Sequence, residues 1–391
     1  MATIDNLQSA ICNPPRLIAW EVTRTCLLNC RHCRAAARSE PFEGELSTAE
    51  CFRLLDNIAS FAKPIIILTG GEPMLRADIY DIASRAHSLG LPVVMAPCGL
   101  LLNDQTVRKI VESGIHRISL SLDGATAKSH DDFRGYAGSF AAVMEGIAAA
   151  RRGGLDFQIN TTVSRHNIGE LEAILDLAVK LGASVFNPFL LVPTGRGRAL
   201  ADQELTAGQY EQVLQWLSGQ RTRGGIQIRV TCAPHYQRII RQSGARENGE
   251  ERREKREEGV PGGCKGTHPS SLFPLPSSSS SSQTPHAANG CLGGKSFAFI
   301  SHVGKVQICG FMDVECGDVR AADFDLRRIW ETSDVFRQLR DVDSYHGRCG
   351  VCEFRKVCSG CRARAYAMTG DWLGEEPFCS YEPKGKVQNA E

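Results

Sequence analysis

A short apolar run leads directly into three closely spaced cysteines in Leu17-Ile-Ala-Trp-Glu-Val-Thr-Arg-Thr-Cys-Leu-Leu-Asn-Cys-Arg-His-Cys33. The run Leu17–Val22 predicts a strand, and Cys26, Cys30 and Cys33 then lie on the loop that follows it. Thiolates are the ligands that iron–sulfur clusters select, and three of them can hold three irons of a cubane and leave the fourth open. A zinc site usually has four ligands in pairs, so this spacing favours a cluster.

Similar apolar runs recur up to about Val230 and alternate with helical patterns. Five further strands are predicted, at Ile65–Thr69, Val93–Ala96, Ile115–Leu122, Phe157–Thr162 and Val185–Leu190. A capping box, Ser47-x-x-Glu50, opens the first helix. Strands that are apolar on both faces and separated by helices imply a parallel sheet in an α/β fold. Six such units would make a partial barrel of the TIM type, with functional groups at the C-terminal ends of the strands.

The overall composition indicates which binding partners and which cellular compartment to expect. Of 391 residues, 45 are Lys or Arg and 44 are Asp or Glu, so charge gives no indication of nucleic acid or an anionic membrane. No basic segment followed by an apolar core begins the sequence, and no apolar run approaches the length of a membrane span. We therefore expect a cytoplasmic protein with neither partner, whose sixteen cysteines serve metal binding rather than disulfides.

Composition divides the chain into four parts. A short segment, residues 1–16, precedes a barrel domain at residues 17–242. Residues 243–285 combine a dense run of mixed charge with Gly, Pro and six consecutive serines, Ser277–Ser282, which predicts a mobile low-complexity insertion. A small cysteine-rich domain is predicted at residues 286–391.

Polar motifs follow several predicted strands. Gly70-Gly-Glu-Pro73 follows the second strand, Asp123 lies just beyond the fourth, and Asn160 ends the fifth. With the three cysteines, these motifs resemble the radical S-adenosylmethionine (SAM) family, whose members bind SAM on the open iron of a 4Fe–4S cluster. The resemblance implies a partial (β/α)6 barrel, and it assigns SAM contacts to Gly70, Gly71, Glu72, Pro73, Ser119, Ser121, Arg134 and Asn160.

The later cysteines form a second pattern. Cys291 precedes Gly304-x4-Cys309, and Cys349-x2-Cys352-x5-Cys358-x2-Cys361 is followed by Cys379, which resembles a SPASM domain with one or two auxiliary 4Fe–4S clusters. The resemblance implies an outer cluster on Cys349, Cys352, Cys358 and Cys379, and an inner one on Cys291, Cys309 and Cys361. Only two residues separate Cys358 from Cys361, where the family has three. The sequence does not decide whether the fourth ligand of the inner cluster is Cys316, Cys264 or a non-protein group. For Cys349–Cys361, the alternative to an iron–sulfur cluster is a zinc ribbon.

Five short motifs reduce the number of substrate classes to consider. Trp20–Arg24, Cys33–Ala37, Leu191–Gly197, Val230–Tyr236 and Phe299–His302 resemble the radical SAM heme synthases of the siroheme-dependent heme pathway. The resemblance implies oxidative decarboxylation of two propionates of Fe-coproporphyrin III to vinyls, giving heme b. It also implies an iron porphyrin as substrate and a low-potential electron donor such as flavodoxin or ferredoxin.

Several basic residues are candidates for contact with such a substrate. An unpaired buried carboxylate costs several kcal/mol, so the propionates need cations, for which Arg196, Arg198 and Arg229 are candidates. His32 and His235 are candidates for contact with the iron or a propionate. The alternatives are an enzyme acting on other siroheme-derived tetrapyrroles, a SPASM peptide or protein maturase, and a non-catalytic iron–sulfur or zinc protein. The intact SAM motifs argue against the last of these.

Overall fold

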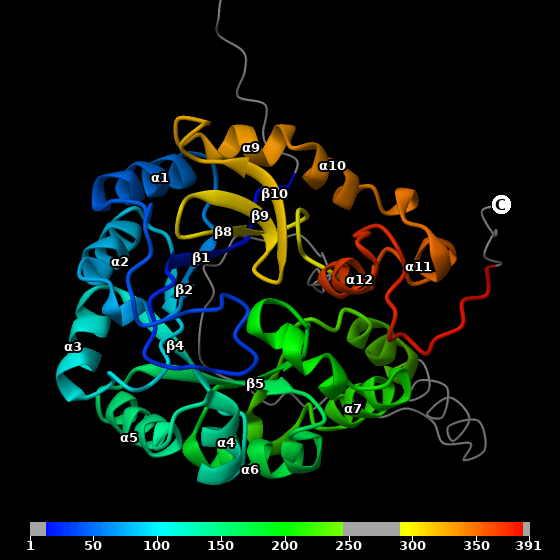
Figure 1. Cartoon of the computed structure of the whole chain (residues 1–391), viewed down its shortest axis with the longest axis horizontal. Coiled ribbons are helices and arrows are strands. Elements are labelled where there is room, and N and C mark those ends of the chain that lie inside the picture. The colour runs from blue at the N-terminus through cyan, green and yellow to red at the C-terminus, as the bar shows by residue number, and fades with distance from the viewer. Residues whose placement is uncertain (1–12, 245–289, 386–391) are drawn as a thin grey trace, which may run out of the picture.

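The computed structural model describes residues 13–244 and 290–385, which form one curled sheet with helices around its outside (Figure 1). Seven parallel strands follow in chain order: β1 Leu17–Thr23, β2 Ile65–Gly70, β3 Val93–Met95, β4 Ile115–Ser121, β5 Asp156–Val163, β6 Val185–Leu190 and β7 Gln227–Ile228. The first six match the predicted strands to within one residue at each end. The short β7, which was not predicted, pairs with β6.

Three strands from the cysteine-rich region join the same sheet. They are β8 Phe297–Ile300, β9 Lys305–Cys309 and β10 Met312–Asp318. β8 lies parallel to β1, with Leu17 opposite Phe297 and Trp20 opposite Ile300, and the next two strands continue antiparallel. The sheet order is therefore β10-β9-β8-β1 and onward to β7, and the barrel and cysteine-rich regions share one sheet. The predicted insertion between them lies almost wholly outside the described residues.

Helices cover the outer face of the barrel strands (Figure 1). They are α1 Thr48–Phe61, α2 Ile79–Ser88, α3 Asp104–Glu112, α4 Ala127–Arg134, α5 Ser139–Arg152, α6 Leu171–Leu181 and α7 Ala207–Gly219. The predicted capping box is confirmed, because Ser47 and Glu50 each accept the other's backbone N–H at the start of α1. The cysteine-rich region adds α9 Leu326–Thr332, α10 Asp334–Arg340, α11 Gly347–Val351 and α12 Arg362–Thr369.

The sheet and its helices enclose one large apolar core. Ile18, Leu68, Ile118 and Ile159, which lie on β1, β2, β4 and β5, are fully buried. Because the barrel strands are parallel, their C-terminal ends meet at one rim, where the loops carrying the predicted motifs come together. In the part of the chain that the structure describes, no helix is long and apolar enough to cross a bilayer.

Candidate active site

A large cavity opens at the C-terminal rim of the barrel. Its volume is about 1050 Å³, and it is bordered by the loop after β1 and the ends of β2, β4, β5 and β6. Predicted site residues line it from all of these segments: Cys26, Cys30, His32, Cys33, Gly70, Gly71, Ser119, Ser121, Arg134, Asn160 and Arg196. A cavity of this kind, with polar groups converging from several elements, is the usual form of a ligand site.

The loop after β1 brings the three cysteines to this cavity. Each sulfur has a hydrogen-bond donor: Leu28 N lies 3.4 Å from Cys26 Sγ, Ala37 N 3.5 Å from Cys33 Sγ, and Arg134 Nη1 3.5 Å from Cys30 Sγ. Burial raises the pKa of Cys26 to about 11 and also raises that of Cys30, so these thiols must lose protons to bind a metal. The donors around each sulfur fit thiolate ligands of a cluster.

Two glycines fix the start of this loop against the end of β2. A Cβ on Gly70 would lie 2.0 Å from Thr23 O, and one on Gly71 would lie 2.3 Å from Thr25 O. Gly71 N instead donates to Thr23 O over 2.8 Å, and Glu72 N donates to Thr25 O over the same distance. The Gly-Gly-Glu motif therefore positions the cysteine loop as well as lining the cavity.

The carboxylate of Glu72 points away from solvent. It accepts hydrogen bonds from Cys98 N at 2.5 Å and Met74 N at 2.9 Å, and its side chain is fully buried. Burial raises the pKa of this carboxyl group. In the structure Glu72 thus ties the turn beginning at Pro73 to the end of β3, while Gly70 and Gly71 face the cavity.

Arg134, at the end of α4, contacts the carboxylate of Asp123 and the thiol of Cys30 on the cysteine loop. Its Nε lies 2.8 Å from Asp123 Oδ2, and its Nη1 reaches Cys30 Sγ. Next to it, His32 stacks on Phe133 with ring centroids 4.3 Å apart. Burial lowers the pKa of His32 to about 4, so its ring is neutral at pH 7.

Of the three arginines predicted to bind carboxylates, only Arg196 lines the cavity. Its Nε donates to Cys30 O at 2.9 Å and its Nη1 to Ala37 O at 2.5 Å, while its buried Nη2 has no partner among the described residues. Arg198 is exposed on the same segment. Arg229 lies beside the start of β6, where its N–H donates to Phe186 O, so it is away from the rim.

The four predicted outer-cluster cysteines surround a second, smaller cavity. Cys349, Cys352, Cys358 and Cys379 all line it, together with His235. His235 is buried and neither ring nitrogen has a partner in the described ranges, so it faces these thiols and not the large cavity. Because the four thiols line one cavity, they are suited to bind a single cluster.

The inner cysteines form a separate group of thiols. Burial and the neighbouring thiols of Cys291 and Cys361 raise the pKa of Cys309. A fourth thiol lies beside them, because Cys232 is a neighbour of both Cys361 and Cys309. Cys316 lies elsewhere, with its Sγ 3.8 Å from Val314 O.

In residues 13–244 and 290–385, no three His, Cys, Asp or Glu side chains converge tightly enough to hold a single metal ion. An iron–sulfur cubane does not require the thiolates to converge on one point, because each thiolate binds a different iron of the cluster.

The sequence comparisons identify the superfamily. The profile of the Radical SAM superfamily matches residues 20–178, which hold the three cysteines and the Gly-Gly-Glu motif. An "AdoMet-dependent heme synthase" of Nitratidesulfovibrio vulgaris is 45% identical over 94% of this chain and 93% of its own length. One from Methanosarcina barkeri is also 45% identical, over 96% of this chain and 99% of its own. The chain belongs to the radical SAM superfamily.

Solved structures support the same fold. The SAM-bound SuiB of Streptococcus suis matches 94% of this chain and 77% of its own with a TM-score of 0.69 at 13% identity. SAM-bound anSMEcpe matches 93% of this chain and 94% of its own with a TM-score of 0.64 at 14% identity. This radical SAM enzyme thus uses a 4Fe–4S cluster and SAM, for which Cys26, Cys30 and Cys33 and the cavity beside them are the fitting residues.

Two site features of this radical SAM enzyme escaped sequence reasoning. Arg34 lines the large cavity, ion-pairs with Glu21 at 2.8 Å and lies 4.7 Å above the ring of Phe299. It is also an electrostatic neighbour of Cys309, so it stands between the cavity and the inner thiols. The second feature is Cys232, which lies beside the inner thiols. Both belong to motifs that were noted for their resemblance, Cys33–Ala37 and Val230–Tyr236, but their contacts come from distant segments.

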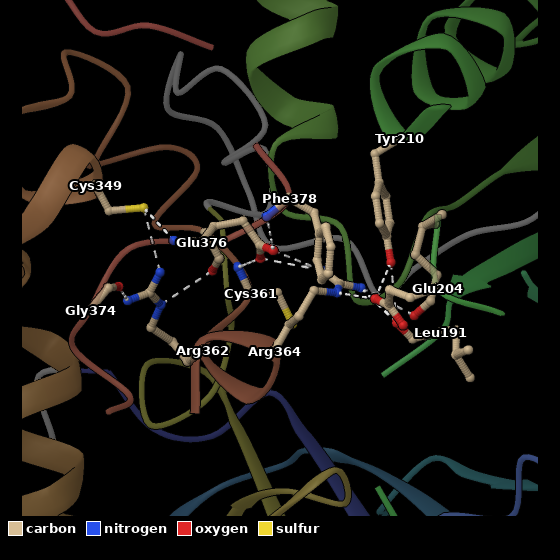
Figure 2. Close-up of polar contacts among 12 residues, drawn as sticks. Leu191, Glu204, Tyr210, Cys349, Cys361, Arg362, Arg364, Gly374, Glu376 and Phe378 are labelled. Carbon is tan, nitrogen blue, oxygen red and sulfur yellow. Dashed lines mark hydrogen bonds and ion pairs between the residues drawn. The ribbon is translucent and has the colours of Figure 1, made fainter. Parts of the chain in front are cut away.

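A buried ion-pair network joins the cysteine-rich region to the barrel (Figure 2). Arg364 of α12 lies 2.9 Å from Glu204 Oε1 and 3.3 Å from Glu376 Oε2, and Tyr210 donates to Glu204 over 2.6 Å. Glu376 also touches both groups of thiols, since its N–H donates to Cys349 Sγ at 3.3 Å and its carboxylate accepts from Cys361 N at 2.7 Å. One residue thus links the inner and outer cysteines.

Breaking this network is expected to lower stability strongly. Arg364→Met would leave the buried carboxylates of Glu204 and Glu376 without their cation, which costs about 3–5 kcal/mol in comparable pairs. Arg320→Met, which removes a partly exposed ion pair with Glu50, should cost only about 0–1 kcal/mol. Thermal unfolding of both variants measures the difference, and equal melting temperatures would contradict it.

Proposed function

We propose that this enzyme converts two propionates of Fe-coproporphyrin III to vinyl groups and so makes heme b. The proposal is supported by the 45% identity to proteins named AdoMet-dependent heme synthase, which spans nearly their whole length. The observation that carries it is the position of Arg34, which lines the large cavity and neighbours the inner thiol of Cys309. A substrate in the cavity is therefore close to a site for an electron acceptor.

The chemistry requires such an acceptor. When bound, SAM and its reduced cluster supply a 5′-deoxyadenosyl radical. Each propionate loses a hydrogen atom from the carbon next to the macrocycle, then the bond to its carboxylate breaks, CO₂ leaves and one electron must depart. Two propionates therefore consume two SAM and yield two 5′-deoxyadenosine, two methionine and two CO₂. The fold's part is to position the substrate and to lead the electrons away.

The cavity offers groups suited to an iron porphyrin. Phe189, Leu190, Val192 and Phe311 give it an apolar wall against which a flat macrocycle can pack. Arg196 also lines the cavity, its Nη2 has no partner among the described residues, and a guanidinium holds a carboxylate through a charge-assisted hydrogen bond. We therefore assign a propionate to Arg196, while Arg134 is already paired with Asp123.

Weakening the Arg196 contact is expected to weaken porphyrin binding. Arg196→Lys keeps the charge but loses the planar donor set, so the dissociation constant should rise roughly tenfold, as a lost charged hydrogen bond predicts. Arg198→Lys, on the exposed face of the same segment, is the matched control and should bind like the parent. Absorbance titration with Fe-coproporphyrin III measures both. Equal affinities in the two variants would remove Arg196 from the substrate site.

The proposed reaction is tested by anaerobic turnover. Reconstituted enzyme, SAM and reductant should convert Fe-coproporphyrin III to heme b, seen by mass spectrometry as the loss of two carboxyl groups and two further hydrogen atoms. A siroheme-derived tetrapyrrole in place of the porphyrin should remain unchanged. If the enzyme converts only that compound, the proposed reaction is wrong. The enzyme would then resemble in its chemistry a 27% identical protein of Methanosarcina barkeri that is named Fe-coproporphyrin III synthase.

A further inference from the structure

The segment after β7 places a thiol at the edge of the barrel. Thr231 N donates to Pro188 O at 2.9 Å, and Leu190 N donates to Thr231 O at 3.2 Å, so this segment continues alongside β6. Cys232 then turns the chain away from the sheet with a φ of 60°. A left-handed conformation is unfavourable for a residue with a Cβ, and it persists where the surrounding structure demands it.

The side chain of Cys232 points to the inner thiols. Arg364, three residues after Cys361, donates to Leu190 O at 3.3 Å and to Leu191 O at 3.1 Å, at the end of β6 that the segment before Cys232 follows. Cys232 and Cys361 are therefore neighbours, and Cys309 is a further neighbour of Cys232. Cys309 in turn neighbours Cys291 and Cys361. Four thiols from four separate segments thus meet: the turn after β7, the segment before β8, the end of β9 and the start of α12.

We propose that Cys232 is the fourth thiolate ligand of the inner auxiliary cluster. A cubane has four irons, and the three cysteines that the SPASM pattern supplies would leave one iron without a protein ligand. The thiol that neighbours two of these three, Cys361 and Cys309, is the natural fourth. Cys316 lies apart from them, its sulfur beside Val314 O, and Cys264 is outside the described residues.

With Cys232 as a ligand, the two clusters beside the large cavity differ in their coordination. The cluster on Cys26, Cys30 and Cys33 keeps one iron open to SAM, whereas the inner cluster has no open iron. A substrate carboxylate then cannot bind the inner cluster directly, and an electron reaches it across the wall formed by Arg34 and Phe311. The assignment concerns cluster ligands alone, so it stands or falls independently of the substrate.

The test uses the full chain with Cys26, Cys30 and Cys33 all replaced by Ala, which removes the cluster whose open iron would also bind added ligands. Cyanide is the probe, and electron paramagnetic resonance (EPR) of the reduced auxiliary clusters is the readout. With Cys232 present, cyanide should leave the spectrum unchanged. Adding Cys232→Ala should make one cluster signal sensitive to cyanide, and mild oxidation should then produce the EPR signal of a three-iron cluster.

Cys316→Ala in the same background is the matched control, because it removes a half-buried thiol of the same region. It should behave like the background in both measurements. The proposal is overturned if cyanide already shifts the spectrum with Cys232 intact, or if the Cys232 and Cys316 variants are indistinguishable. Should Cys232→Ala fail to fold, Cys232→Ser takes its place: an oxygen ligand instead of sulfur should shift the EPR signal of one auxiliary cluster, and an unchanged signal would overturn the proposal.

Discussion

Alanine in place of Cys26, Cys30 or Cys33 is expected to abolish formation of 5′-deoxyadenosine. Each of these cysteines lines the large cavity and has a hydrogen-bond donor on its sulfur, as a thiolate ligand requires. Two thiolates cannot hold a cubane with one open iron, so SAM would not be cleaved. The auxiliary clusters should remain, because their cysteines come from other segments. Chromatographic measurement of 5′-deoxyadenosine, with iron and sulfide content, checks both parts.

Cys51→Ala is the matched control for these variants. Cys51 is fully buried and belongs to α1, but its sulfur contacts Arg76 and Leu46 O and not the cavity. It should retain SAM cleavage. Undiminished 5′-deoxyadenosine in any of the three cluster variants would remove the SAM cluster from this loop.

Replacing both Cys349 and Cys352 by Ala is expected to separate radical formation from heme formation. The two thiols line the small cavity, and Glu376 links that site to the inner thiols through Cys349 and Cys361. Without the outer cluster the route for the substrate electron is interrupted. The variant should therefore still form 5′-deoxyadenosine but yield little or no divinyl product, which mass spectrometry of the porphyrin measures.

Loss of folding must be separated from loss of electron transfer in this double variant, since structural metal sites stabilise small domains. Iron content should fall only by the outer cluster, and the melting temperature of the barrel should stay near that of the parent. A well-folded double variant that makes heme b at the parent's rate would show that electrons leave by another route.

The barrel and its first metal site were predictable because their signals are local. Leu17–Val22 is apolar on both faces and is followed within a few residues by Cys26, Cys30 and Cys33. The outer cysteines share this property, since all of them except Cys379 fall within ten residues. Short spacing constrains a loop enough for its chemistry to be inferred.

Features that depend on distant pairing were not predictable. β8 pairs with β1 across some 280 residues, and this pairing brings Cys309 to Arg34. Cys232 meets Cys361 only because the turn after β7 lies beside the start of α12. For the same reason His235 was placed with the substrate by its motif, while the structure buries it beside the outer thiols. Periodicity and spacing describe neighbours in sequence, and these contacts are made by the tertiary fold.

Transfer of deuterium tests the central account most directly. Fe-coproporphyrin III would carry deuterium on the propionate carbons next to the macrocycle, and the reaction would be stopped before SAM is exhausted. We expect one deuterium in 5′-deoxyadenosine for each vinyl group formed, together with loss of one CO₂ per event. Formation of unlabelled 5′-deoxyadenosine with an intact porphyrin would contradict the account.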